Sequence, residues 1–124
     1  MIKCLKLGED MDKIKISIPQ KIEYYSSVRL FISGILSNFD FDVEYIEDYK
    51  MAVTEGLNIS KIQGKLENIE IELDIEENYI MTFIKGIEEN FKEEETEMSK
   101  LIIESLIDKV IFEADGLKLI KIRE

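Results

Sequence analysis

The stretch Ile16–Glu55, ISIPQKIEYYSSVRLFISGILSNFDFDVEYIEDYKMAVTE, decides the fold of this chain. Apolar residues alternate up to Pro19, which has no backbone N–H to donate and therefore predicts the end of a strand. Beyond it, apolar residues recur at helical spacing, which predicts helices over about 22–39 and about 43–62. Asp42 suits the start of the second helix, and Gly64 suits its end.

The rest of the chain predicts more strands and one further helix. Asn68–Ile75 alternates cleanly, as a strand with one buried face does. Tyr79–Ile84 is apolar at nearly every residue, which is typical of a strand covered on both faces. A helix of about three turns is expected near residues 98–106. In the last strand, 117–123, the apolar phase slips between Leu119 and Ile120, which indicates a bulge.

The resulting order is strand, two helices, two strands, helix and two strands. It predicts an α+β fold, a two-layer α/β sandwich with helices on one face of a mostly antiparallel sheet. A chain of 124 residues suits one domain, expected over 13–124 after an N-terminal arm at 1–12.

Composition restricts the function. The formal net charge is −11, so a nucleic acid is not an expected partner, whereas a basic protein surface is. The sequence has no histidine, which leaves carboxylates and lysines for any catalysis. Cys4 is the single cysteine, so neither a disulfide nor a thiolate metal cluster is expected. With no apolar run near about 18 residues and no signal peptide, we expect a cytoplasmic protein without membrane contact.

The strand, the two helices and the run Ala52-Val53-Thr54-Glu55 resemble the anti-sigma-factor serine kinases of the histidine-kinase-like ATPase superfamily. The resemblance extends over roughly Lys13 to Arg123 and implies the histidine-kinase-like ATPase fold. It also implies a site for ATP and Mg²⁺ built from three pieces, which this sequence matches only in part.

The first piece lies on the second helix. Glu55 falls on the family's general base, whereas the register of the Mg²⁺-binding asparagine falls on Ile59 and Asn58 comes one residue early. Asn58 is the candidate cofactor-binding residue. Glu55 shares its helical face with apolar residues such as Ala52, so it is interpreted either as a relic of the nucleotide pocket or as the edge of a packing face.

The other two pieces are poorly matched. Lys85 stands where the family has an aspartate that accepts a hydrogen bond from adenine, and an ammonium can only donate. The phosphate-binding lid falls on Thr96–Ser99, which contains no glycine. Acidic residues crowd this place and are interpreted as a solvated loop or short helix: Glu93, Glu94, Glu95 and Glu97. We therefore expect a degenerate nucleotide site with neither a cofactor nor a metal ligand.

Three functions remain open. The first is an anti-sigma-like regulator that binds partner proteins without ATP turnover, so that the chain is not an enzyme. By resemblance, its partners would be a sigma factor or an anti-anti-sigma protein, and Arg29 in the first helix matches an arginine of the family's partner surface. The second is a divergent serine kinase that uses ATP and Mg²⁺. The third is a non-catalytic subunit that serves dimerisation or scaffolding, and a homodimer is open in each case.

Overall fold

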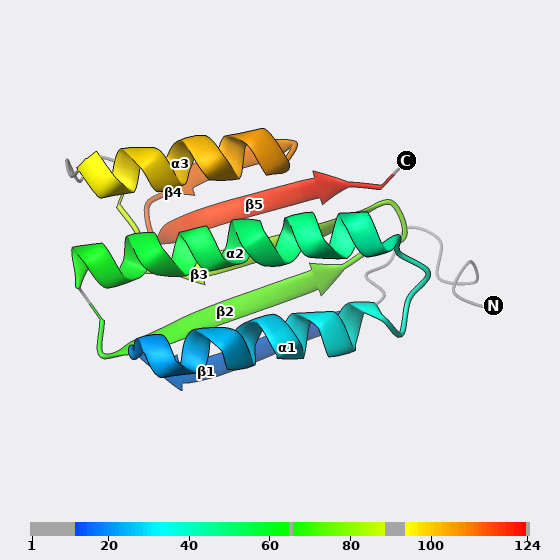
Figure 1. Ribbon diagram of the computed structural model, residues 1–124, viewed down its shortest axis with the longest axis horizontal. Helices are drawn as coiled ribbons and strands as arrows, with labels where there is room; N and C mark the ends of the chain where they lie inside the picture. Colours follow the sequence, from blue (N-terminus) through cyan, green and yellow to red (C-terminus); the bar gives the residue numbers. More distant parts are fainter. Residues whose placement is uncertain (1–11, 65, 89–93, 124) are drawn as a thin grey trace.

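The computed structural model describes residues 12–64, 66–88 and 94–123 (Figure 1). The predicted N-terminal arm lies outside these residues, apart from Asp12. The elements follow the predicted order, and a short 3-10 helix, η2, precedes the first α-helix. Their bounds are β1 Asp12–Pro19, η2 Ile22–Tyr24, α1 Tyr25–Leu36, α2 Val43–Gln63, β2 Asn68–Ile75, β3 Tyr79–Lys85, α3 Glu94–Leu106, β4 Lys109–Glu113 and β5 Gly116–Ile122.

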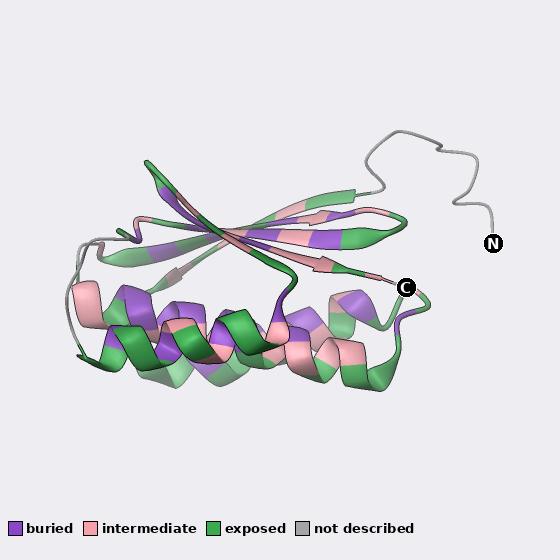
Figure 2. Cartoon of the chain, turned by 90° about the horizontal axis from the view of Figure 1, so that it is seen from above, coloured by how far each residue is buried: buried purple, intermediate pink, exposed green. Residues whose placement is uncertain are grey.

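The strands form one five-stranded sheet in the order β1-β2-β3-β5-β4, and every neighbouring pair is antiparallel. Figure 2 shows the three helices on one face of this sheet. The two-layer α+β prediction is therefore confirmed. Among the described residues, no helix has the length and apolar character needed to span a membrane.

The core lies between the sheet and the helices. It is built from alternate residues of the strands, such as Ile69, Ile71 and Leu73 of β2, and from one stripe of each helix. These strand residues are almost completely buried because they lie on the face of the sheet that the helices cover.

Helix α2 lies in the middle of the helix layer, with α1 on one side and α3 on the other (Figure 1). It approaches β3 closely at Gly56, where an added Cβ would lie 2.5 Å from Cδ1 of Ile84. The missing side chain at position 56 therefore sets how closely α2 packs on the sheet.

The observed ends of α2 can be compared with the capping residues predicted from the sequence, Asp42 and Gly64. Gly64 takes a left-handed backbone with a φ of 60°, and its N–H donates to the carbonyl of Ser60, so its predicted role is confirmed. Asp42 is the N-cap residue, but its side chain makes no capping hydrogen bond.

The first α-helix ends at Leu36, before the predicted residue 39. There, Ser37 and Asn38 both donate side-chain hydrogen bonds to the carbonyl of Gly34, which competes with a further helical turn.

Two predictions about the sheet are wrong. β3 is not covered on both faces, because only alternate residues such as Ile80 and Ile84 are buried. β5 contains no bulge, since its pairing with β3 is continuous: it runs without a break from the pair of Tyr79 and Ile122 to the pair of Lys85 and Gly116. The apolar phase slips because Lys121, rather than an apolar residue, is paired with buried Ile80 on the face that the helices cover.

Helix α3 begins at Glu94, earlier than predicted, and ends at Leu106. Glu94, Glu95 and Glu97 lie in its first turn, where the helix dipole favours negative charge. Of the two interpretations, loop or short helix, the structure therefore confirms the helix for these three residues, whereas Glu93 lies outside the described residues.

We predict that Gly56→Ala lowers the free energy of unfolding by about 1–2 kcal/mol, because overpacking against the buried side chain of Ile84 outweighs the about 0.5–1 kcal/mol that alanine gains over glycine inside a helix. Gly34→Ala is the matched control, since nothing lies within 4 Å of a Cβ there. It should stabilise α1 by about 0.5–1 kcal/mol. Urea denaturation of both variants measures the difference, and an equal response would contradict the close approach at Gly56.

Candidate functional site

The predicted site residues Glu55 and Asn58 lie in an open hollow of about 410 Å³ between α2 and α3. Both helices contribute to its lining, which consists of Glu55, Asn58, Lys61, Ile62, Glu95, Met98, Ser99 and Ile102. Residues three and four apart on a helix share a face, so α2 presents Glu55, Asn58 and Ile62 to the same hollow.

The carboxylate of Glu55 is held from both helices. The hydroxyl of Ser99 on α3 donates to Oε1 of Glu55 at 2.8 Å, and the amide of Asn58 lies 3.5 Å from the same oxygen. The one-residue displacement of Asn58 therefore does not separate it from Glu55. Ser99 is almost completely buried, so its hydrogen bond to Glu55 ties α3 to α2.

Ser99 was assigned to a lid by resemblance, and its contact with Glu55 was missed. The lid register Thr96–Ser99 is helical, and both of its end residues are buried against the rest of the fold. Apolar and small residues at 96, 99 and 103 fall at helical spacing, and this signal could have extended the predicted helix toward residue 94.

A second group of contacts joins the C-terminal end of α2 to the loop after β3. The side-chain amide of Gln63 donates to the carbonyl of Glu88 at 2.8 Å and accepts from its N–H at 2.9 Å. Gly86 has a φ of 86°, and its N–H donates to the carbonyl of Asp115. An added Cβ at Gly86 would lie 2.4 Å from Cδ1 of Leu66, so the loop after β3 packs directly on the chain that follows α2.

Lys85 does not face the hollow. It belongs to the outward-facing set of β3, and its ammonium lies 3.9 Å from a carboxylate oxygen of Glu70 on β2. The residues present thus do not fit ATP in the family's manner, because the adenine acceptor is replaced by an exposed donor. Within the residues that the structure describes, no group of three or more cysteine or acidic side chains could hold a metal ion.

Arg29 lies on α1 and is half-buried. Of its neighbours in sequence, Val28 is buried and Leu30 is 72% exposed. Among the described residues, none forms an ion pair or hydrogen bond with its guanidinium. Helix α2 separates α1 from α3 (Figure 1), and the Glu55 hollow is lined by residues of α2 and α3, so α1, which carries Arg29, does not border it.

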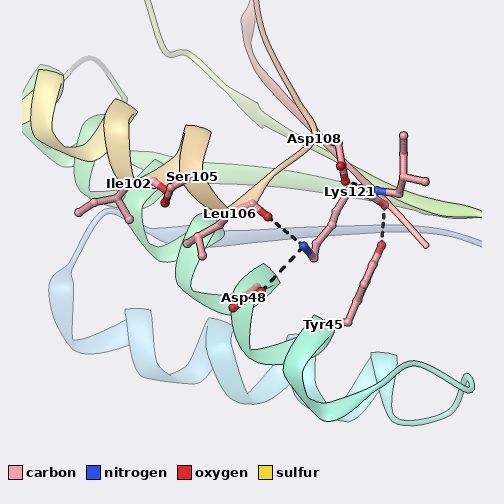
Figure 3. Close-up of polar contacts among 8 residues, drawn as sticks. Tyr45, Asp48, Ile102, Ser105, Leu106, Asp108 and Lys121 are labelled. Carbon is pink, nitrogen blue, oxygen red and sulfur yellow. Dashed lines mark hydrogen bonds and ion pairs between the residues drawn. The ribbon is translucent and has the colours of Figure 1, made fainter. Parts of the chain in front are cut away.

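A polar network at the N-terminal end of α2 was not predicted (Figure 3). The ammonium of Lys121 donates to the carbonyl of Leu106 at 2.9 Å and lies 4.0 Å from Asp48. The hydroxyl of Tyr45 donates to the carbonyl of Lys121, and burial raises the pKa of this tyrosine well above its usual value. The network fixes β5 to both α2 and the end of α3, and the apolar phase slip at Ile120 was its signal in the sequence.

Comparison with known proteins finds partial matches to RsbW serine-protein kinases. An RsbW serine-protein kinase of Listeria monocytogenes is 49% identical over 49 residues, which are 40% of this chain and 31% of the relative. An RsbW serine-protein kinase of Oceanobacillus iheyensis is 33% identical over 84 residues, which are 64% of this chain and 53% of the relative. The resemblance to the RsbW serine-protein kinases is confirmed. The chain spans about half or less of the length of these RsbW relatives, and no family model matches it.

A solved structure supports the same fold. The crystal structure of the RsbU and RsbW domains of a Mycobacterium tuberculosis protein superposes on this chain with a TM-score of 0.67. The match covers 92% of this chain and 32% of that one, at 14% sequence identity. At this identity the match confirms the fold that the RsbW resemblance implied, and nothing about activity.

We predict that Ser99→Ala lowers the free energy of unfolding by about 1–2 kcal/mol, because Glu55 loses a charge-assisted hydrogen bond. Ser105→Ala is the matched control on the same helix, since that hydroxyl is exposed and bonds only to the carbonyl of Ile102. Thermal and urea unfolding would compare the two variants. Equal stability would mean that the contact between Ser99 and Glu55 does not hold α3 in place.

Proposed function

We propose that this protein is a regulator of the anti-sigma type that acts by binding partner proteins and does not turn over ATP. The observation that carries the proposal is the hydrogen bond from Ser99 to Glu55. It engages the candidate general base with a side chain of the neighbouring helix, in the register where the family has a mobile phosphate-binding lid. The RsbW relatives supply the regulatory part of the proposal.

The chemistry around the hollow supports the non-catalytic part. Glu94, Glu95 and Glu97 start α3, so a triphosphate near this helix would meet carboxylates rather than the free N–H groups of a glycine-rich loop. Gln63 and Gly86 hold the loop after β3 through their own hydrogen bonds. These polar groups thus have hydrogen-bond partners within the protein, which supports a role without ATP.

A second candidate function is a divergent serine kinase. One observation favours it, because Glu55 and Asn58 share the hollow and could act there as base and metal ligand. A third candidate, a scaffold subunit without a sigma-factor partner, would leave Arg29 without a binding role.

We predict that Mg-ATP binds no more tightly than about millimolar, where only about 4 kcal/mol of net interaction remains. Isothermal titration calorimetry of the whole chain tests this. Glu55→Gln is the control, since it keeps the shape of the side chain and removes its charge. Micromolar affinity that Glu55→Gln alters would place ATP in the hollow and favour the kinase.

We predict that a sigma factor or an anti-anti-sigma protein binds a surface around Arg29 on α1. An arginine can pair with a carboxylate in a forked geometry, and truncation of such a residue at an interface often costs about 2 kcal/mol or more. Half-buried Arg29 and exposed Leu30 offer a cation beside an apolar contact. The partner should therefore present an acidic group to this otherwise acidic chain.

The measurement is a pull-down or two-hybrid assay against sigma factors and anti-anti-sigma proteins with Arg29→Glu. Lys61→Glu is the matched control, because it makes a similar charge reversal on the exposed last turn of α2. Arg29→Glu should reduce binding at least about tenfold, whereas Lys61→Glu and Glu55→Ala should not. A partner that stays fully bound to Arg29→Glu would exclude this surface.

A further inference from the structure

The first strand, β1, lies at one edge of the sheet, and one of its two sides has no neighbouring strand among the described residues (Figure 1). It has eight residues, whereas β4 at the opposite edge has five. A long edge strand exposes a row of backbone donors and acceptors with which another chain can pair. Natural proteins usually shorten, cover or interrupt such an edge, so the open side of β1 is an unusual feature of this sheet.

The backbone hydrogen bonds show which residues of β1 point to the open side. The N–H of Gln20, just after β1, donates to the carbonyl of Glu67, just before β2, so these two residues form a hydrogen-bonded pair. Such pairs recur at every second residue of an antiparallel ladder. In the register of β1 with β2, the even-numbered residues of β1 therefore bond to β2, and the backbone groups of its odd-numbered residues point away from β2.

Two observations agree with this assignment. Glu76, just after β2, donates to the carbonyl of Tyr79, so the even-numbered residues of β2 bond to β3 and its odd-numbered residues bond to β1. Pro19, which has no N–H, falls on the open side, where an edge strand tolerates proline. Among the described residues, no hydrogen-bond partner meets the outward backbone groups of Lys15 and Ser17.

The inner side chains of β1 are also incompletely covered. Ile14, Ile16 and Ile18 are half-buried, although the residues that they pair with on β2 are almost completely buried. On α1, which lies over this edge of the sheet, Phe31 and Ile35 are half-buried as well (Figure 1). A further strand beside β1 would therefore place its inner side chains next to apolar residues and bury more of their surface.

Charge indicates which side chains suit the outer face of such a strand. Lys13 and Lys15 are exposed on the outer face, in a chain whose net charge is −11. The ammonium of Lys13 lies 3.9 Å from a carboxylate oxygen of Asp74 on β2, and Lys15 pairs with Glu72 of the same strand. Acidic side chains on a strand beside β1 would continue this alternation of charge, because opposite charges on directly paired residues attract.

We propose that the open edge of β1 is a docking site for an extended segment of another protein, which joins the five-stranded sheet as an antiparallel sixth strand. The segment alternates apolar residues, which face α1, with acidic or hydroxyl residues, which lie opposite Lys13, Lys15 and Ser17. Main-chain hydrogen bonds provide affinity in this mode of binding, and the alternate side chains provide specificity. The site uses neither Arg29 nor the Glu55 hollow, so it goes beyond the proposed function and does not depend on it.

Fluorescence anisotropy of a labelled peptide with the whole chain tests the proposal. In the peptide Val-Thr-Val-Glu-Val-Glu-Val, antiparallel pairing places threonine opposite Ser17 and the glutamates opposite Lys15 and Lys13. This peptide should bind, and the same peptide with lysine in place of glutamate should bind at least about tenfold more weakly. The lysine peptide is a stringent control, because the net charge of −11 attracts it to the chain as a whole.

Two N-methylated forms of the glutamate peptide test the backbone pairing. In an antiparallel ladder the N–H groups of directly paired residues point toward each other at every second pair. Only the peptide residues opposite Lys13, Lys15 and Ser17 therefore direct their N–H groups at β1. N-methylation of both glutamates should abolish binding, whereas N-methylation of the two valines that flank the first glutamate should leave binding intact.

A substitution in β1 tests the same hydrogen bonds from the side of the protein. Ser17→Pro removes one outward N–H and leaves the hydrogen bonds to β2 in place, so it should weaken peptide binding at least about tenfold. Ser17→Val is the matched control, because valine keeps the N–H and suits a strand. It should bind the peptide as the wild type does.

Three results would overturn the proposal. The first is a wild-type chain that does not bind the glutamate peptide, as occupation of the edge by residues 1–11 or by a second copy requires. The second is equal binding of the two N-methylated peptides. The third is a folded Ser17→Pro chain that binds as tightly as the wild type. If Ser17→Pro fails to fold, the N-methylated peptides still decide the question, because they are tested on the unaltered chain.

Discussion

The close approach of α2 to the centre of the sheet is the constraint on which the rest of the structure depends. Gly56 allows the backbone of α2 to lie against Ile84 on β3, the middle strand. Helices α1 and α3 then fill the spaces on either side and cover the outer strands (Figure 1). With α2 at this depth, Glu55 lies beside α3, where the hydroxyl of Ser99 reaches its carboxylate.

In the candidate site, polar side chains form hydrogen bonds with groups on neighbouring elements. The hydroxyl of Ser99 donates a hydrogen bond to the carboxylate of Glu55, and the side-chain amide of Gln63 donates one to the backbone carbonyl of Glu88. Each contact satisfies a polar group that would otherwise need a ligand or water. These internal contacts are the basis of the proposal that the chain does not turn over ATP.

The sequence predicted most of the fold because its strands and helices have clear and different periods. β2 alternates without interruption, and Gly64 ends α2 through a backbone conformation that glycine favours. The sequence-based predictions failed where hydrogen bonds of individual side chains interrupt the regular spacing of apolar residues. Ser37 and Asn38 end α1 early by bonding to Gly34, and Lys121 is held on the inner face by Leu106 and Asp48.

The candidate site was predictable only in part for a related reason. Glu55 and Asn58 were found because both lie on one helix, where three residues of separation fix their relative position. Ser99 was not found, because its contact with Glu55 depends on how two helices pack. The acidic residues before it left a loop and a short helix both open, because solvated loops and helix N-termini accept the same residues.

The pairing of β1 with β2 has a consequence for how the protein folds during synthesis. The β2–β3 and β4–β5 hairpins join strands that are close in sequence, whereas Asp12 of β1 pairs with Ile75 of β2. Closing so long a loop is slow compared with forming a hairpin. During synthesis β1 therefore stays unpaired until both long helices and the start of β2 have emerged. Over that interval Ile14, Ile16 and Ile18 have no sheet to pack on, so their apolar side chains are open to contacts with other chains.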